Sequence, residues 1–167
     1  MNYFVAALPR SRTAWLSVFL SQSGIHCLHD GMNGCASIEE YMVKLGDFGD
    51  SSTGIAMFDI EVLYPNCPIV IIEKNEKELR DCIEWCDLIY GGNNEAEIIR
   101  QQKLIDKMPG MRIKQSEINV NLEAIFTYLT GCEWKPIYAD IKKLNIQSDP
   151  YAIDIDAAER LMLEAIQ

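Results

Sequence analysis

Near its start the chain reads Tyr3-Phe4-Val5-Ala6-Ala7-Leu8-Pro9-Arg10-Ser11-Arg12-Thr13-Ala14-Trp15. The first six of these residues have the apolar composition of a buried strand, and apolar side chains at helical spacing follow the turn. In a strand, turn and helix of this kind, the N–H groups of the turn and of the helix N-terminus bind an anion. Arg10 and Arg12 add two positive charges to the turn. The stretch therefore predicts a loop that binds a phosphorylated ligand.

The overall charge of the chain is acidic. Its 167 residues carry 25 acidic and 15 basic side chains, a formal net charge of −10. Nucleic acids and anionic membranes are bound by basic surfaces, so this balance argues against both partners. No segment reaches the roughly 20 apolar residues of a membrane span, and no secretory leader is recognised in the first residues. The six cysteines indicate reduced thiols. We therefore expect a cytoplasmic protein that binds a small anionic ligand in a local basic pocket.

Segments with strand and helix patterns alternate along the rest of the chain. The clearest strand covers residues 68–72, a continuous apolar run typical of a strand buried on both faces of a parallel sheet. Residues 46–54 are rich in Gly, Asp and Ser, and are expected to form a loop near the ligand or a mobile cover. Shorter strands are expected at residues 25–28 and 111–114. Helices are expected at residues 13–22, 37–45, 93–108, 122–130, 136–146 and 154–166, and after the capping pair Asn75 and Glu78.

The alternation of strands and helices predicts an α/β fold. One three-layer α/β/α domain is expected over residues 1–167, with a mostly parallel sheet and a helical C-terminal part. Ligands of such sheets bind at the carboxyl ends of the strands. The turn with Arg10 is therefore expected at that edge, with the strands at residues 3–8 and 69–72 parallel to each other in one sheet.

The turn differs from the P-loop of nucleoside triphosphatases. That motif reads G-x-x-x-x-G-K-[ST], in which the Lys contacts the terminal phosphates and the hydroxyl binds magnesium. Here Arg12-Thr13-Ala14 stands in place of its last three residues, and Ala14 cannot ligate a metal. A small-molecule kinase would need a magnesium ligand that the sequence does not show. Binding of a phosphate or sulfuryl group without a metal stays open.

Residues 9–16 resemble the signature P-[KR]-S-G-T-T-W-L of sulfotransferases. In that family the loop binds the 5′-phosphosulfate of 3′-phosphoadenosine 5′-phosphosulfate (PAPS). The second signature of the family is a strand that ends in R-N-P-x-D and is followed by a serine on the next helix, and it binds the 3′-phosphate. Residues 69–78 resemble this signature and place Lys74 at its arginine and Cys82 at its serine. A third, weaker likeness covers residues 116–131.

The resemblance implies a short sulfotransferase-like protein of the bacterial or bacteriophage type. Such a protein transfers a sulfuryl group from PAPS to a hydroxyl or amine of a small-molecule acceptor without a metal, and releases adenosine 3′,5′-bisphosphate. The chain departs from the family at Arg12, which replaces the loop glycine, and in a strand expected near residues 56–59, which lacks the sequence K-T-H. The alternative is a catalytically silent nucleotide-binding or interaction protein with the same fold. The residues that would bind the donor are Pro9, Arg10, Ser11, Arg12, Thr13, Ala14, Trp15, Lys74 and Cys82.

Two further residues are candidates for proton transfer. His29 and Asp30 follow the second expected strand, where some family members place a glutamate as the base for the acceptor hydroxyl. Either residue is a candidate base, and both also suit a plain turn. Arg10 is expected to stabilise charge on the leaving oxygen. A zinc site at His26 and Cys27 is disfavoured, because neighbouring strand residues point to opposite faces of a sheet.

Overall fold

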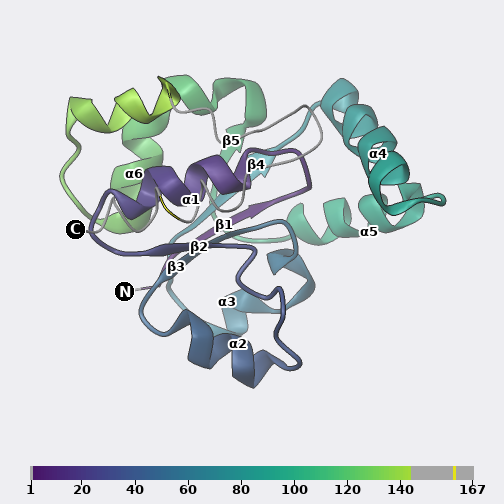
Figure 1. Cartoon of the computed structure of the whole chain (residues 1–167), viewed down its shortest axis with the longest axis horizontal. Coiled ribbons are helices and arrows are strands. Elements are labelled where there is room, and N and C mark those ends of the chain that lie inside the picture. The colour runs from purple at the N-terminus through teal and green to yellow at the C-terminus, as the bar shows by residue number, and fades with distance from the viewer. Residues whose placement is uncertain (1, 144–159, 161–167) are drawn as a thin grey trace.

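Five parallel strands form one sheet at the centre of the molecule, in the order β2-β3-β1-β4-β5 (Figure 1). The structure is a computed structural model and describes residues 2–143 and Arg160. β1 pairs in parallel with β4 along its whole length. The predicted α/β fold is thereby confirmed. The strands are β1 (Phe4–Ala7), β2 (Cys27–His29), β3 (Gly49–Ser52), β4 (Ile69–Glu73) and β5 (Met111–Lys114).

Helices cover both faces of this sheet, which gives three layers (Figure 1). The core on one face joins the sheet to α1 (Thr13–Ser21) and α6 (Leu122–Thr130). The core on the other face includes side chains of α2 (Ile38–Leu45), α3 (Ile60–Leu63), α4 (Glu76–Tyr90) and α5 (Glu95–Ile105). Three 3₁₀ helices are also described: η1 (Ile55–Met57), η2 (Gln115–Val120) and η3 (Pro136–Lys143).

The apolar sequence of β1 follows from its position in the middle of the sheet. Val5 and Ala7 lie in the core with α1 and α6, whereas Phe4 and Ala6 lie in the core on the opposite face. Successive side chains of a strand point to opposite faces. A strand covered by helices on both faces is therefore apolar at every position, and β4 repeats this pattern.

β3 shows that the loop expected at residues 46–54 was wrong. Residues Gly49–Ser52 are buried and pair with β1 and β2 on either side. The polar side chains of β3 have internal partners: Asp50 accepts a hydrogen bond from the Tyr41 hydroxyl at 2.8 Å, and Ser51 Oγ donates to the Thr13 carbonyl at 2.8 Å. This strand is thus stabilised by partners remote in sequence, and no apolar pattern marks it.

Three other expectations differ from the structure. Residues 56–59 form no strand, because η1 ends at Met57 and a turn at residues 58 and 59 leads into α3. Residues 136–143 form a 3₁₀ helix in place of the start of the expected helix. Residues 144–146 and, apart from Arg160, the helix expected at 154–166 lie outside the described residues. The helix expected at 93–108 is shorter, at Glu95–Ile105. The capping box of Asn75 and Glu78 at the start of α4 is confirmed.

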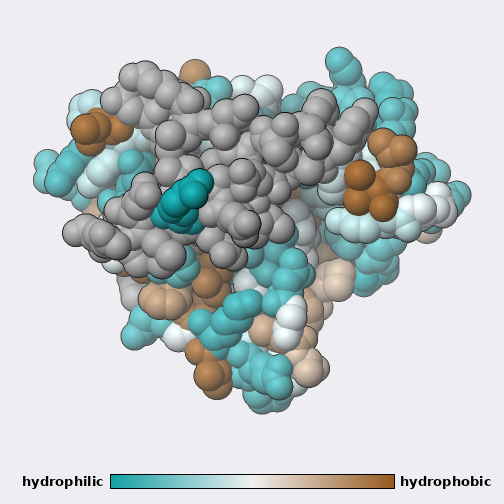
Figure 2. All heavy atoms as spheres, in the orientation of Figure 1, coloured by the Kyte–Doolittle hydropathy of each residue, from teal (hydrophilic) through white to brown (hydrophobic). Residues whose placement is uncertain are grey.

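All six cysteines are free thiols. Within residues 2–143, no helix has the length and apolar character that crossing a membrane requires. Figure 2 shows a largely hydrophilic described surface on the face viewed, with hydrophobic surface confined to separate patches.

Candidate functional site

Polar residues gather where the strands end, at the carboxyl edge of the sheet. The β1–α1 loop (residues 8–12) lies at the centre of this edge, because β1 is the middle strand. His29 ends β2 on one side of the loop, with Asp30 next to it. Lys74 follows β4 on the other side. The two groups of residues that the sequence separates by more than forty positions therefore flank one loop.

The backbone of the β1–α1 loop is left-handed at both arginines, with φ 65° at Arg10 and 63° at Arg12. This conformation costs about 1–2 kcal/mol for a residue with a β-carbon, whereas glycine adopts it readily. Arg12 therefore keeps the backbone conformation that suits the glycine of the sulfotransferase signature. Its guanidinium donates to Asn119 Oδ1 at 2.9 Å and lies 4.3 Å from the centroid of the Trp15 ring.

Ser11 is the most unusual residue of the loop. Its side chain is 0% exposed, and Oγ has no hydrogen-bond partner among the described residues. A buried hydroxyl without a partner costs about 1–3 kcal/mol. Ser11 lies next to the N-terminus of α1, whose first turn has no acidic residue and whose N-cap, Arg12, forms no side-chain cap. An anion bound here would accept hydrogen bonds both from Ser11 and from the unpaired N–H groups of the helix.

On the β2 side of the loop, the two candidate bases contact α1 and each other. Thr13 Oγ1 lies 3.2 Å from His29 Nε2, and the same nitrogen lies 3.3 Å from Asp30 Oδ2. Asp30 Oδ1 accepts hydrogen bonds from the backbone N–H and the hydroxyl of Thr53, at 2.7 Å and 3.2 Å. The structure therefore places His29 against the first residue of α1, directly after the loop, with Asp30 beside it.

The protonation of His29 follows from these contacts. Asp30 can only accept a hydrogen bond when ionised, so its carboxylate favours a proton on His29 Nε2 and leaves the lone pair on Nδ1. Burial lowers the pKa of His29 below its ordinary 6.5, and the charge of Asp30 opposes this change. At neutral pH the imidazole is therefore an uncharged base. Both oxygens of Asp30, by contrast, already lie next to hydrogen-bond donors.

On the β4 side, Lys74 joins the loop directly. Its Nζ donates to the Arg10 carbonyl at 3.1 Å and to Gln115 Oε1 at 2.5 Å. Burial is the main cause that lowers the pKa of Lys74; Cys82 and Glu78 oppose this change, and the nearby Arg10 charge adds a smaller lowering. The Arg10 guanidinium lies 5.8 Å from the centroid of the Trp85 ring on α4. Two cationic side chains thus lie beside the loop on this side.

The other sequence-predicted residues lie deeper in the fold. Cys82 on α4 is 0% exposed, and burial raises the pKa of its thiol to about 12, so that a neutral thiol stands at the position that resembles the serine of the sulfotransferase signature. Ala14 and Trp15 belong to α1 and are buried, and Trp15 stacks on Phe19 with 5.3 Å between ring centroids. Pro9 is half-buried in the loop.

Four polar partners of the site were missed at the sequence level. Thr53 and Gln115 follow β3 and β5, and their positions just after strands were the only available signal. Ser51 and Asn119 carry no such signal, because their contacts with Thr13 and Arg12 depend on the order of the strands.

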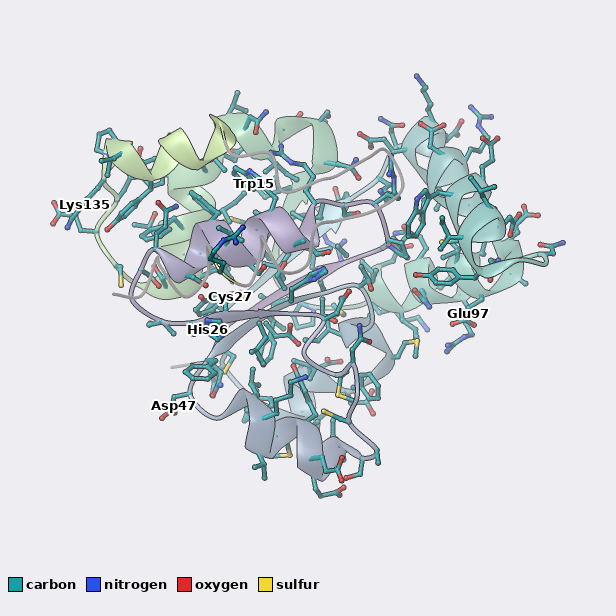
Figure 3. The ribbon with its side chains drawn as sticks, viewed as in Figure 1. Trp15, His26, Cys27, Asp47, Glu97 and Lys135 are labelled. Carbon is teal, nitrogen blue, oxygen red and sulfur yellow. The ribbon has the colours of Figure 1, made fainter. Side chains whose placement is uncertain are left out.

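The side chains of His26 and Cys27 lie in different surroundings. They lie side by side at the start of β2 (Figure 3), where the His26 ring packs edge-on against Phe48 and Cys27 is buried in the core. Within residues 2–143, no group of three or more His, Cys, Asp or Glu side chains is placed to hold a metal ion.

No protein-family model matches the chain, and comparison with curated proteins finds no match to its sequence. The resemblance to sulfotransferases therefore depends on the sequence motifs themselves.

Proposed function

We propose that this protein binds PAPS in the β1–α1 loop and transfers its sulfuryl group to a hydroxyl or amine of a small acceptor. The observation that carries the proposal is the buried, unpartnered hydroxyl of Ser11 at the N-terminus of α1. An anionic group supplies the acceptor that this hydroxyl and the helix N-terminus lack. The loop motif of the sequence agrees with a phosphosulfate in this place.

The residues on either side of the loop supply complementary chemistry. In the transfer step the acceptor oxygen or nitrogen forms a bond to sulfur, and the bond between sulfur and the 5′-phosphate oxygen breaks. The departing phosphate gains negative charge, which the Arg10 side chain stabilises, while Lys74 holds the 3′-phosphate of the donor. His29 takes the proton of the acceptor through its lone pair at Nδ1, because Nε2 faces the carboxylate of Asp30. Asp30 orients the imidazole.

A second candidate function is a nucleotide-binding protein without turnover. It is favoured by the position of Cys82, whose buried neutral thiol is a weak hydrogen-bond donor to a 3′-phosphate. It is also favoured by Lys74, whose ammonium is already bonded to Arg10 and Gln115.

The first prediction concerns the two phosphates of the ligand. Adenosine 3′,5′-bisphosphate is expected to bind about 10-fold or more tightly than AMP, without magnesium, because the second phosphate gains a charge-assisted hydrogen bond worth about 1.5–3 kcal/mol. Isothermal titration calorimetry in the presence of EDTA measures both affinities. Lys74→Ala is expected to remove the difference, and Lys103→Ala, an exposed lysine of α5, serves as the control.

Equal affinities for the two nucleotides would contradict the assignment of a 3′-phosphate site. Binding of ATP that is tighter than both, and that requires magnesium, would favour a kinase instead.

A second prediction tests the loop itself. Arg10→Ala is expected to weaken binding of adenosine 3′,5′-bisphosphate by about 10-fold or more, because a hydrogen bond to a charged group is lost. The matched control is Arg100→Ala, which removes an exposed arginine that pairs with Glu97 on the surface of α5. An unchanged affinity in Arg10→Ala would exclude this loop as the phosphate site.

A further inference from the structure

The turn that carries His29 and Asp30 is held by a buried carboxylate that the proposed reaction does not use. Asp50 lies in β3 and is 0% exposed. Its Oδ1 accepts a hydrogen bond from the backbone N–H of Gly31 at 3.1 Å, and its Oδ2 accepts one from the Tyr41 hydroxyl at 2.8 Å. Asp50 therefore links the turn after β2 to helix α2 beneath it.

The turn fits closely on β3. The Asp30 N–H donates to the Ser51 carbonyl at 3.2 Å, so two consecutive N–H groups of the turn bond to β3. A β-carbon at Gly31 would lie 2.9 Å from Asp50 Oδ2, closer than ordinary contacts allow. Asp30 itself has a left-handed backbone, with φ 48°. This backbone conformation is sparsely populated, and surrounding contacts must stabilise it.

We propose that Asp50 is a positioning residue: through Gly31 and Tyr41 it holds the turn after β2 so that the His29 imidazole faces Thr13. The value of this arrangement for catalysis rests on the proposed function, because it makes His29 the base. The anchoring of the turn does not depend on the function.

The anchor that Asp50 forms does not depend on the charge of its carboxyl group. Burial raises the pKa of its carboxyl to about 7, and the hydrogen bonds from Tyr41 and Gly31 oppose this change. The other titratable groups that act on it are Lys44 of α2, Cys27 of β2 and Asp30. Either protonation state has an oxygen that accepts from Gly31, and the neutral acid donates to the Tyr41 oxygen. The anchor is therefore present on both sides of neutral pH.

The experiment uses the imidazole of His29 as a reporter. The chain has two histidines, His26 and His29, so the NMR signals of both rings can be followed separately through a pH titration of the ligand-free protein. In Asp50→Ala the turn is expected to be released and the pKa of His29 to rise toward its ordinary value, because burial is the main cause of its lowering. The pKa of His26, at the other end of β2, is expected to be unchanged.

Asp50→Asn is the matched conservative variant. Its amide oxygen still accepts from the Gly31 N–H and its NH₂ group donates to the Tyr41 oxygen, so His29 is expected to titrate as in the wild type. Tyr41→Phe removes one hydrogen bond and leaves the ring in place. Tyr41→Phe is expected to raise the pKa of His29 by less than Asp50→Ala does. If Asp50→Ala does not fold, the His29 titration of Tyr41→Phe tests the proposal in its place.

An unchanged His29 titration in folded Asp50→Ala, or in Tyr41→Phe where Asp50→Ala is unfolded, would overturn the proposal. The titration needs neither donor nor acceptor. Its failure therefore leaves the proposed function standing, whereas failure of the wild-type protein to bind adenosine 3′,5′-bisphosphate would refute that function and leave the anchor intact.

Discussion

Replacement of His29 by glutamine is expected to lower the rate of sulfuryl transfer by about 100-fold or more, the usual effect of losing a general base. Binding of adenosine 3′,5′-bisphosphate is expected to be unchanged, because the His29 side chain contacts Thr13 and Asp30 rather than the loop arginines. The rate is measured in single-turnover reactions with PAPS and 4-nitrophenol as a model hydroxyl acceptor. In the wild type it is expected to fall as the pH decreases through the lowered pKa of His29, where the imidazole becomes protonated.

Asp30→Asn is the partner variant, a near-isosteric change that keeps the turn. Asp30→Asn is expected to slow transfer by less than His29→Gln does, because in the wild type the Asp30 carboxylate orients the imidazole and does not take the proton. A larger decrease in the transfer rate of Asp30→Asn than of His29→Gln would instead identify Asp30 as the base. If neither variant slows transfer and Arg10→Ala affects only binding, the nucleotide-binding protein without turnover becomes the better proposal.

Gly49→Ala is expected to destabilise the fold by about 3 kcal/mol, at the upper end of the cost of overfilling a core. A β-carbon at this position would lie 2.1 Å from Tyr3 Cε2, and Tyr3 is 0% exposed, so its ring has no free space to move into. The free energy of unfolding is measured by urea denaturation followed by circular dichroism. Gly54→Ala is the control, because Gly54 has no atom within 4 Å of an added β-carbon.

For Gly54→Ala, the free energy of unfolding is expected to stay within about 0.5 kcal/mol of the wild type. Equal stability of Gly49→Ala and Gly54→Ala would contradict the packing of the Tyr3 ring against β3.

The parts of the fold that the sequence predicted are those whose stability comes from local patterns. β1 and β4 are apolar runs buried on both faces, and the capping box of Asn75 and Glu78 marks the start of α4 within four residues. β3 could not be predicted in this way. Its polar side chains are satisfied by residues such as Tyr41 and Thr13, and a sequence pattern does not show such pairings.

In the candidate site, too, local sequence motifs predicted some positions, whereas others depend on residues remote in the sequence. The position of Arg10 in a turn after β1, and of Lys74 after β4, followed from motifs, and the structure places Lys74 Nζ 3.1 Å from the Arg10 carbonyl. The choice between His29 and Asp30 could not be made from sequence. It depends on Thr53, which donates to one oxygen of Asp30 and follows β3, the strand that was not expected.

Insertion of β3 between β1 and β2 also limits the order in which the chain can assemble. β2 precedes β3 in the sequence but, among the described strands, pairs only with β3, whereas β1 pairs directly with β4. β2 therefore has no strand to dock on until the polar β3 has closed on β1, a step with little apolar burial to drive it. Folding is thus expected to spread outward from β1, β4 and β5. The half of the sheet that carries His29 and Asp30 is expected to form last and to open at a lower free energy than the whole domain.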